Sequence, residues 1–431
     1  MNRAARTILL RLALGSLAVA GVILLASASS PAAARSGGAS APGSPSDDGV
    51  SFPKIASFRA GSAVAPSVIA RYDWVVTDGS GYGLDRLDQV HRLNPHQLQM
   101  IQVWGGVCGR ETIAATYGFG QVCRPFSSPW GTLRSMSTAD EVVDPNGAVH
   151  QYGTVDVLNM QQHAGADSTA IWSARVRTAY YLQDVRGHPQ IRGIWGDNDF
   201  WSDQGYAWSG ISVDPRAWDD GFVANHLELQ HLLPRGAIIG GNDLSSMAAH
   251  PSAYRGSAPG GWRLLGGGGQ AGMKESVNLD SGLEQPDGLD GLIRSVQTWL
   301  HLKTLDGRQR YEMINVTGVS GTSSTARLAL AAACISGGYL WGYLGGDFAT
   351  TFDFWMPEFD KYGRHWLGHP LADGGRARSG VWVRRFEHGT VVANATDSPQ
   401  TVQGITAAPR DAAFVRHENG TAPPLRTSAS R

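Results

Sequence analysis

Short apolar segments recur eight times along the chain, and most of them end in Gly, Asp or Asn. Runs of this length that are bounded by turn-forming residues predict buried β-strands. In order, they cover residues 54–58, 72–78, 98–105, 191–198, 237–242, a weak and polar stretch between Ala271 and Glu284, 311–318 and 338–344. This series constrains the fold more than any other feature of the sequence.

Helical stretches separate many of these strands, with apolar residues every three to four positions. They cover residues 171–183, 218–233, 289–302 and 324–335. Alternating strands and helices predict parallel pairing with right-handed crossovers. Eight such units close naturally into an α/β fold of the (β/α)8 or TIM-barrel type, which we expect over residues 51–372. An open doubly wound sheet is the alternative.

A different pattern follows Pro370. Residues 379–385, 390–395 and 401–405 alternate apolar and polar positions at period two, with turn-forming residues between them. They predict a small antiparallel β unit over residues 373–416. The polar residues 417–431 are expected to form a disordered tail.

The N-terminus has the layout of a secretory signal. Arg3, Arg6 and Arg11 precede or enter an apolar run, and small residues follow it. We expect a signal peptide over residues 1–34, a flexible linker over 35–50 and a secreted product. If the apolar run is not cleaved, it is about long enough to anchor the chain in a membrane at the cell envelope.

Cysteine usage agrees with export. Cys108 and Cys123 bracket a Gly-rich stretch, and in an exported protein this spacing favours a disulfide. Cys334 lies in an Ala-rich apolar segment and is expected to be a buried thiol. The long segment 106–153, which holds the cysteine pair, is expected to fold over the barrel mouth, with the Gly-rich segment 240–272 as a second rim element.

Several classes of function have no support in the sequence. The formal net charge is −1 and no basic block follows the signal, which argues against a nucleic-acid partner. Glycine-rich nucleotide loops and the HExxH pattern are absent, so we expect no cofactor and no metal. A GxSxG elbow is also absent, which argues against an ester hydrolase.

Candidate site residues follow from the predicted strand ends, because barrel enzymes carry their catalytic groups at the carboxyl ends of the strands. Acids, amides and aromatic rings occupy these positions. The predicted substrate-binding residues are Asp78, Trp104, Asn198, Asp199, Trp201, Asn242, Trp341 and Tyr343. The rings suit sugar stacking, although each is equally compatible with barrel packing.

Cleavage of a glycosidic bond needs one ionised carboxyl group and one that holds a proton. Asp197, at the end of the fourth strand, is our candidate for the ionised group, with Asp199 as the alternative. A strand-ending Asp can also merely cap a turn. The proton donor is predicted to be Glu275 or Glu284, with a slight preference for Glu275, although Lys274 beside it is also consistent with a surface ion pair.

The order of these features resembles a group of TIM-barrel glycoside hydrolases related to the α-galactosidase superfamily, in particular hypothetical glycosyl hydrolase family 15. The matching segments are Gly193–Asn198, Ile239–Asn242, Pro357–Asp360, Leu367–Pro370, Trp382–Gly389 and Val391–Asn394. The resemblance implies that Asp197 is the nucleophile and that a sixth-strand acid, Glu275 or Glu284, is the proton donor. The sixth strand departs from the family pattern, which leaves the donor open.

These features favour a secreted glycoside hydrolase that acts on extracellular or cell-envelope polysaccharide, or on oligosaccharide, with retention as the favoured outcome. The alternative is a non-catalytic carbohydrate-binding barrel, in which the acid pair is not opposed across a cavity. Hydrolysis of another bond, such as an ester or amide, would need a nucleophile and base that the sequence does not reveal. Carboxyl groups roughly 5–10 Å apart would favour catalysis over binding alone.

Overall fold

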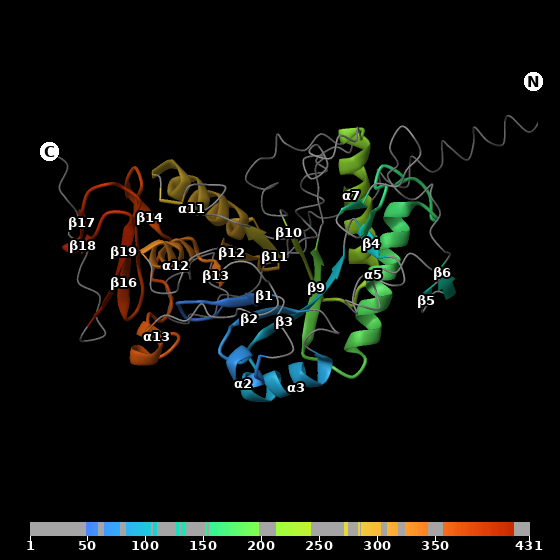
Figure 1. Cartoon of the computed structure of the whole chain (residues 1–431), viewed down its shortest axis with the longest axis horizontal. Coiled ribbons are helices and arrows are strands. Elements are labelled where there is room, and N and C mark those ends of the chain that lie inside the picture. Colours follow the sequence, from blue (N-terminus) through green and yellow to red (C-terminus); the bar gives the residue numbers. More distant parts are fainter. Residues whose placement is uncertain are drawn as a thin grey trace, which may run out of the picture. The chain divides into compact units, whose positions relative to one another are not determined.

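The structure is a computed structural model (Figure 1). It describes residues 49–58, 64–77, 83–104, 107–109, 126–128, 131–133, 151–152, 155–197, 213–242, 271–274, 283–284, 286–302, 308–317, 324–343 and 357–417. The chain divides into two units, Met1–Pro42 and Gly43–Arg431, and every described residue belongs to the second. The predicted signal peptide, most of the predicted linker and all but the first residue of the predicted tail lie outside the described residues.

An eight-stranded sheet forms the centre of the fold, in the order β1-β2-β3-β9-β10-β11-β12-β13. All seven strand pairs along this order are parallel. The strands are β1 (Ala56–Phe58), β2 (Trp74–Thr77), β3 (Leu98–Trp104), β9 (Ile191–Asp197), β10 (Ile238–Asn242), β11 (Ala271–Lys274), β12 (Tyr311–Thr317) and β13 (Tyr339–Tyr343). Each overlaps one of the eight predicted segments, which confirms a mixed α/β fold on a parallel sheet.

The two ends of this sheet meet at one point. The backbone N–H of Leu340 in β13 donates to the carbonyl of Lys54, just before β1, at 3.1 Å. Ile55 and Leu340 form an isolated parallel bridge at the same place. The segment that leads into the first strand therefore runs beside the last strand.

The helices are α2 (Pro66–Ile69), α3 (Leu84–Leu93), α5 (Thr169–Val185), α7 (Pro215–Leu232), α11 (Pro286–His301), α12 (Ser324–Ser336) and α13 (Pro357–Tyr362). α5, α7, α11 and α12 coincide with the four predicted helices, whereas α2, α3 and α13 were not predicted. α7 begins where Pro215 follows Asp214, whose carboxylate accepts from the N–H of Arg216 at 3.0 Å. No helix of the described residues has both the length and the apolar character needed to cross a membrane.

Strand side chains alternate between two cores. One core packs the sheet against the helices and includes Ile101, Ile194 and Ile314. The other receives residues from all eight strands and contains no helix residue. Its buried members, called the interior cluster below, are Ala56, Phe58, Trp74, Val76, Met100, Trp195, Ile238, Ala271, Met313, Tyr339 and Trp341.

Short antiparallel strands occupy the described parts of residues 107–157. They are β4 (Val107–Gly109), β5 (Phe126–Ser128), β6 (Gly131–Leu133), β7 (Gln151–Tyr152) and β8 (Val155–Val157). β4, β8 and β7 form one small sheet, and β5 pairs with β6. Cys108 lies in β4 with Asp156 as its backbone partner, but Cys123 lies outside the described residues. The predicted disulfide and the predicted covering role of this segment remain predictions.

The C-terminal region is antiparallel, as predicted. Its strands are β14 (Gly375–Arg378), β15 (Val381–Arg385), β16 (Gly389–Asn394), β17 (Gln400–Val402), β18 (Ile405–Ala407) and β19 (Asp411–Arg416). β14, β15, β16 and β19 form one sheet, and β17 pairs with β18. The sequence pattern predicted β15, β16 and β17 and missed the other three. All six strands fall within residues 373–416.

Polar contacts join this β unit to the helices α11 and α12. The fully buried Asp290 of α11 accepts from the indole of Trp382 at 2.6 Å and from the N–H of Gly380 at 3.1 Å. Arg327 of α12 donates from Nε to Asp411 at 2.9 Å. The β unit therefore shares an interface with the helices rather than packing only on itself.

Cys334 is a free cysteine and is fully buried. Burial raises the pKa of its thiol to about 12, in spite of nearby Arg384 and Lys54. The predicted buried thiol is confirmed.

Candidate functional site

The carboxyl ends of β3, β9 and β10 bring three of the predicted residues to one edge of the sheet. Trp104 ends β3 and is the direct backbone partner of Asp197, which ends β9. Gly196 pairs with Gly241, so Asn242, the last residue of β10, follows in the position beside Asp197. β9 is the fourth strand of the sheet order, as predicted. The backbone register therefore brings the predicted acid, amide and ring positions together.

Two further predicted residues lie on β13, the eighth strand of the sheet, which pairs with β12, the seventh. Thr317 ends β12 and pairs with Tyr343, which ends β13, and Asn315 pairs with Trp341. Trp341 is only 2% exposed, and its ring lies 5.1 Å from that of Phe58. This burial agrees with the packing alternative for Trp341 rather than with an accessible sugar platform.

Aromatic rings fill the interior below these strand ends. The ring of Trp195 lies 5.8 Å from Phe58 and 5.6 Å from Trp74. Gly240 permits this arrangement, because a Cβ there would stand 2.7 Å from the Trp195 ring. Asp197 follows two positions after Trp195 in the same strand, so the candidate acid comes directly after an apolar aromatic layer.

The remaining predicted residues are not all described. Asp78, Asn198, Asp199, Trp201 and Glu275 lie outside the described residues. For Trp104, Asp197, Asn242 and Tyr343, the structure establishes the strand positions given above.

Glu284 has a described environment. It lies two residues before α11, and its Oε1 accepts a hydrogen bond from the hydroxyl of Thr325 at 3.1 Å. Thr325 is in the first turn of α12. Glu284 is therefore held among the helix starts rather than at a strand end, whereas Glu275 comes immediately after Lys274, the last residue of the sixth strand.

Two buried amides at interior positions were missed by the sequence analysis. Gln102 in β3 is fully buried, and Asn315 in β12 is 2% exposed. Each stands two positions after a methionine of the interior cluster, Met100 and Met313 respectively. A single amide within an apolar strand matches no sequence motif. Only the period-two alternation, counted from the strand ends, could have identified Gln102 and Asn315 as interior positions.

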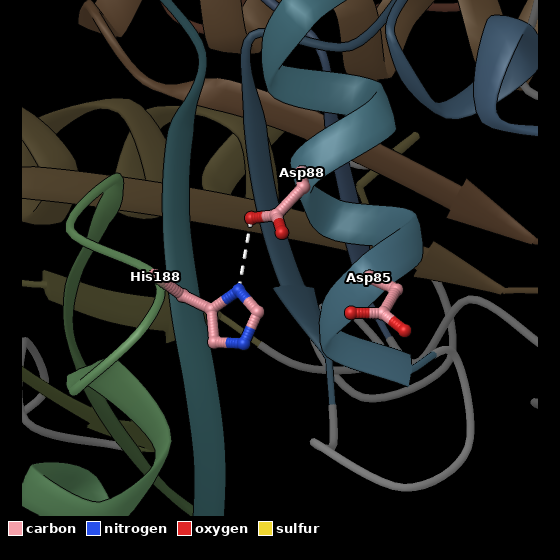
Figure 2. A group of neighbouring side chains, drawn as sticks. All are labelled: Asp85, Asp88 and His188. Carbon is pink, nitrogen blue, oxygen red and sulfur yellow. Dashed lines mark hydrogen bonds and ion pairs between the residues drawn. The ribbon is translucent and has the colours of Figure 1, made fainter.

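Within the described ranges, Asp85, Asp88 and His188 form a group whose ligand atoms lie within 4.8 Å of one another and could hold a metal ion (Figure 2). His188 Nδ1 is 2.9 Å from Asp88 Oδ1, and Gln190 also donates to this oxygen. His188 comes shortly before β9, at the end of the strand opposite Asp197. These contacts link α3 to the segment that enters β9, which is a sufficient structural role for the group.

A cavity of about 470 Å³ lies beside the residues that enter β1 and β2. Its lining is Gly49, Val50, Ser51, Asp73, Asn94, His96, Arg364 and His365. Asp73 accepts from the N–H of Ile55 at 3.0 Å and pairs with His365 at 2.8 Å. Asp73 immediately precedes β2, so the cavity belongs to the amino ends of the strands, away from the predicted site.

Comparison with known proteins gives no family model and no curated protein that matches the chain. Solved structures that are similar include the glycoside hydrolase domain of PelA from Pseudomonas aeruginosa, with 12% identity, coverage of 75% of this chain and 100% of that chain, and a TM-score of 0.39. A GH18 chitinase from Pseudoalteromonas aurantia has 12% identity, coverage of 67% and 93%, and a TM-score of 0.38.

The isomalto-dextranase of Arthrobacter globiformis T6, in complex with panose, has 11% identity, coverage of 85% of this chain and 72% of that chain, and a TM-score of 0.48. All three are distant likenesses to glycoside hydrolases. The resemblance to hypothetical glycosyl hydrolase family 15 remains a prediction, and the roles of residues in this chain rest on its own geometry.

Proposed function

We propose that the chain is a secreted glycoside hydrolase that cleaves glycosidic bonds in extracellular or cell-envelope polysaccharide with a pair of carboxyl groups. One observation carries the proposal. Asp197 ends the fourth strand of an eight-stranded parallel sheet, in direct register with Trp104 at the end of the third. An acid beside a ring position, at the carboxyl ends of parallel strands, is an arrangement suited to carbohydrate chemistry.

We propose that the sheet is a closed (β/α)8 barrel. Support comes from the hydrogen bond between Leu340 and Lys54 at the two ends of the strand order and from the interior cluster, to which all eight strands contribute. An open doubly wound sheet would have two free edges and no common interior. Closure would gather the strand ends around a single mouth.

The two carboxyl groups are assigned different roles. Asp197 would be the ionised group that attacks the anomeric carbon, as in a retaining mechanism with carboxyl groups roughly 5–5.5 Å apart. Glu275 would donate the proton to the leaving oxygen, because it follows directly after the sixth strand. Glu284 is the weaker candidate, since its carboxylate is hydrogen-bonded to Thr325 at the start of α12.

Asp197→Asn tests the central assignment. We expect the purified variant to lose polysaccharide hydrolysis by about 10³-fold or more while its melting temperature stays near that of the wild type. Asp287→Asn, at an exposed position in the first turn of α11, is the matched control and should keep full activity. Full activity in Asp197→Asn would refute the role of Asp197.

The proton donor can be separated from the nucleophile by the choice of leaving group. Glu275→Gln should lose about 10²-fold or more on polysaccharide but keep most activity on an aryl glycoside, whose leaving group needs no proton. Glu284→Gln should keep both activities. The reverse result would move the donor to Glu284. Glycan binding without any turnover by the wild-type chain would favour a carbohydrate-binding barrel instead.

We also propose that the N-terminal segment directs export and is removed. Its basic residues, apolar run and small residues support this. N-terminal sequencing of the exported chain should find a start after Ala28 or near Ala34. Recovery of the uncleaved chain in the membrane fraction would instead identify a membrane anchor.

A further inference from the structure

Among the described buried polar residues of the eight strands, two take positions on the interior face of the sheet. Buried polar residues of these strands are Ser57, Thr77, Gln99, Gln102, Glu312 and Asn315. Side chains alternate along a strand, and positions two residues from an interior-cluster member share its face. By this alternation, Gln102 and Asn315 take interior positions, next to Met100 and Met313. The other four fall on the helix side.

Backbone register sets Gln102 diagonally beside Asp197. Gln102 pairs with Trp195, and two positions further along both strands, Trp104 pairs with Asp197. Neighbouring strands lie about 4.8 Å apart and rise about 3.3 Å per residue, so diagonal neighbours on one face have Cα atoms roughly 8 Å apart, a separation that a long side chain can span. Asn315 lies on β12, which is separated from β9 by β10 and β11. Of Gln102 and Asn315, Gln102 is therefore the one next to the candidate acid, on the β3 side, while Asn242 follows in the position beside Asp197 on β10.

The apolar layer before Asp197 disfavours the ionised form of its carboxyl group. The layer directly before it in the interior contains the buried rings of Trp195, Phe58 and Trp341. An apolar environment disfavours the charged form of a carboxyl group, whereas a hydrogen bond to that form favours it. A hydrogen-bond donor therefore stabilises a nucleophile that must stay ionised above such a layer, and a side-chain amide can supply this donor.

We propose that Gln102 is a positioning residue whose Nε2 donates a hydrogen bond to the Asp197 carboxylate, fixing its orientation and keeping it ionised. The inference rests on the proposed function for the catalytic role of Asp197. The hydrogen bond itself concerns only the two side chains, so it can be tested without substrate. Gln102 would not react with substrate and would act only through Asp197.

Gln102→Met removes the amide at nearly constant volume. Gln99→Met is the matched control, because Gln99 is an equally buried amide of the same strand that faces α3, where it donates to the carbonyl of Leu87 at 3.3 Å. Both variants lose a buried amide. If Gln102 had only a structural role, Gln102→Met and Gln99→Met would therefore have the same effect on the titration of Asp197.

The readout is the pH dependence of carbodiimide labelling of Asp197, measured by peptide mass spectrometry on the full chain, with fragment ions separating Asp197 from Asp199. We expect Gln102→Met to move the labelling midpoint upward by about one pH unit or more, and Gln99→Met to leave it unchanged. Equal midpoints in folded Gln102→Met and wild type would overturn the proposal.

Two further measurements keep the proposal testable if Gln102→Met does not fold. Gln102→Glu places a second carboxyl group beside Asp197 and should raise the midpoint further. The wild-type midpoint should itself lie at or below about 4, the ordinary range for Asp, and a clearly higher value would contradict a donated hydrogen bond.

Activity separates this inference from the proposed function. If the labelling midpoint shifts but the wild type hydrolyses no glycan in a polysaccharide panel, the hydrogen bond stands and the proposed function fails. If the wild type is active and the acid limb of its kcat/KM profile is the same in Gln102→Met, the proposed function stands and the positioning role fails. If Gln102→Met shifts both the labelling midpoint and the acid limb of the kcat/KM profile, the positioning role and the proposed function are both supported.

Discussion

The indole N–H of Trp382 donates a hydrogen bond of 2.6 Å to Oδ1 of Asp290, between the C-terminal β unit and α11. The same oxygen accepts from the N–H of Gly380, and Oδ2 pairs with Arg376 at 2.7 Å. Three groups of the β unit thus converge on one fully buried carboxylate. Asp290 is a central element of the interface that joins the β unit to α11.

Loss of this carboxylate should therefore be costly. We expect Asp290→Ala to lower the free energy of unfolding by about 3–5 kcal/mol, because it leaves buried N–H groups without their acceptor. Urea denaturation measures the loss. Asp287→Ala, on the exposed side of the same helix, should change stability by less than about 0.5 kcal/mol. Similar values for the two variants would contradict a special role for Asp290.

Gly240 should tolerate no side chain. An added Cβ would lie 2.7 Å from the ring of Trp195 and 2.9 Å from the Cβ of Ala271, inside a packed aromatic layer. We expect Gly240→Ala to lower the free energy of unfolding by about 1–3 kcal/mol through overpacking. Gly187→Ala is the control, since its Cβ would meet nothing within 4 Å. A neutral Gly240→Ala would mean that Trp195 packs elsewhere.

Thiol counting tests the cysteines together. Because burial raises the pKa of Cys334 to about 12, its thiol should not react with a disulfide reagent in the native chain at pH 8. If Cys108 and Cys123 form a disulfide, the exported chain should show one thiol when denatured and three after reduction. Three thiols before reduction would exclude the disulfide, and rapid labelling of Cys334 itself in the native chain, identified by peptide mass spectrometry, would contradict the buried thiol.

His417 should make the fold less stable in acid. Burial, followed by Arg385 and His388, lowers the pKa of His417 below its ordinary value of 6.5. The unfolded chain then binds a proton more readily than the folded chain. The stabilising contribution is therefore complete above about pH 6.5 and is lost as the pH falls through the folded pKa.

The comparison of His417→Gln with the wild type measures this effect. Between pH 7.5 and 5.5, the wild type should lose more melting temperature than the variant does. His96→Gln, at an exposed histidine, serves as the control and should follow the wild type. A variant as acid-sensitive as the wild type would show that other groups cause the loss.

The parallel strands were predictable because their apolar runs are continuous and are buried by any fold that covers both faces of a sheet. β3 and β9 were predicted to within one residue of their observed ends. α3 was missed, because only Leu87 and Val90 of its ten residues are buried and its sequence reads as polar. β14 was missed because all four of its residues are exposed, so it carries no alternation.

The local sequence pattern predicted one residue of the candidate site, Asp197, but not the residue proposed to position it, Gln102. Asp197 could be placed at a strand end, since an apolar run stops there. Gln102 could not be identified, because an amide inside a strand becomes informative only when its neighbours across the sheet are known. The sequence pattern leaves Glu275 and Glu284 as alternatives, whereas the contact of Glu284 with Thr325 lies among the helix starts.

By itself, the sequence determined the eight strands, their order along the chain and the acid that ends the fourth, because hydrophobic periodicity is a local property of the chain. Only the tertiary structure decided that Trp104 stands beside Asp197, with Gln102 diagonal to it, and that Asp290 holds the β unit. Register and docking depend on contacts between residues far apart in the sequence, which no local pattern encodes.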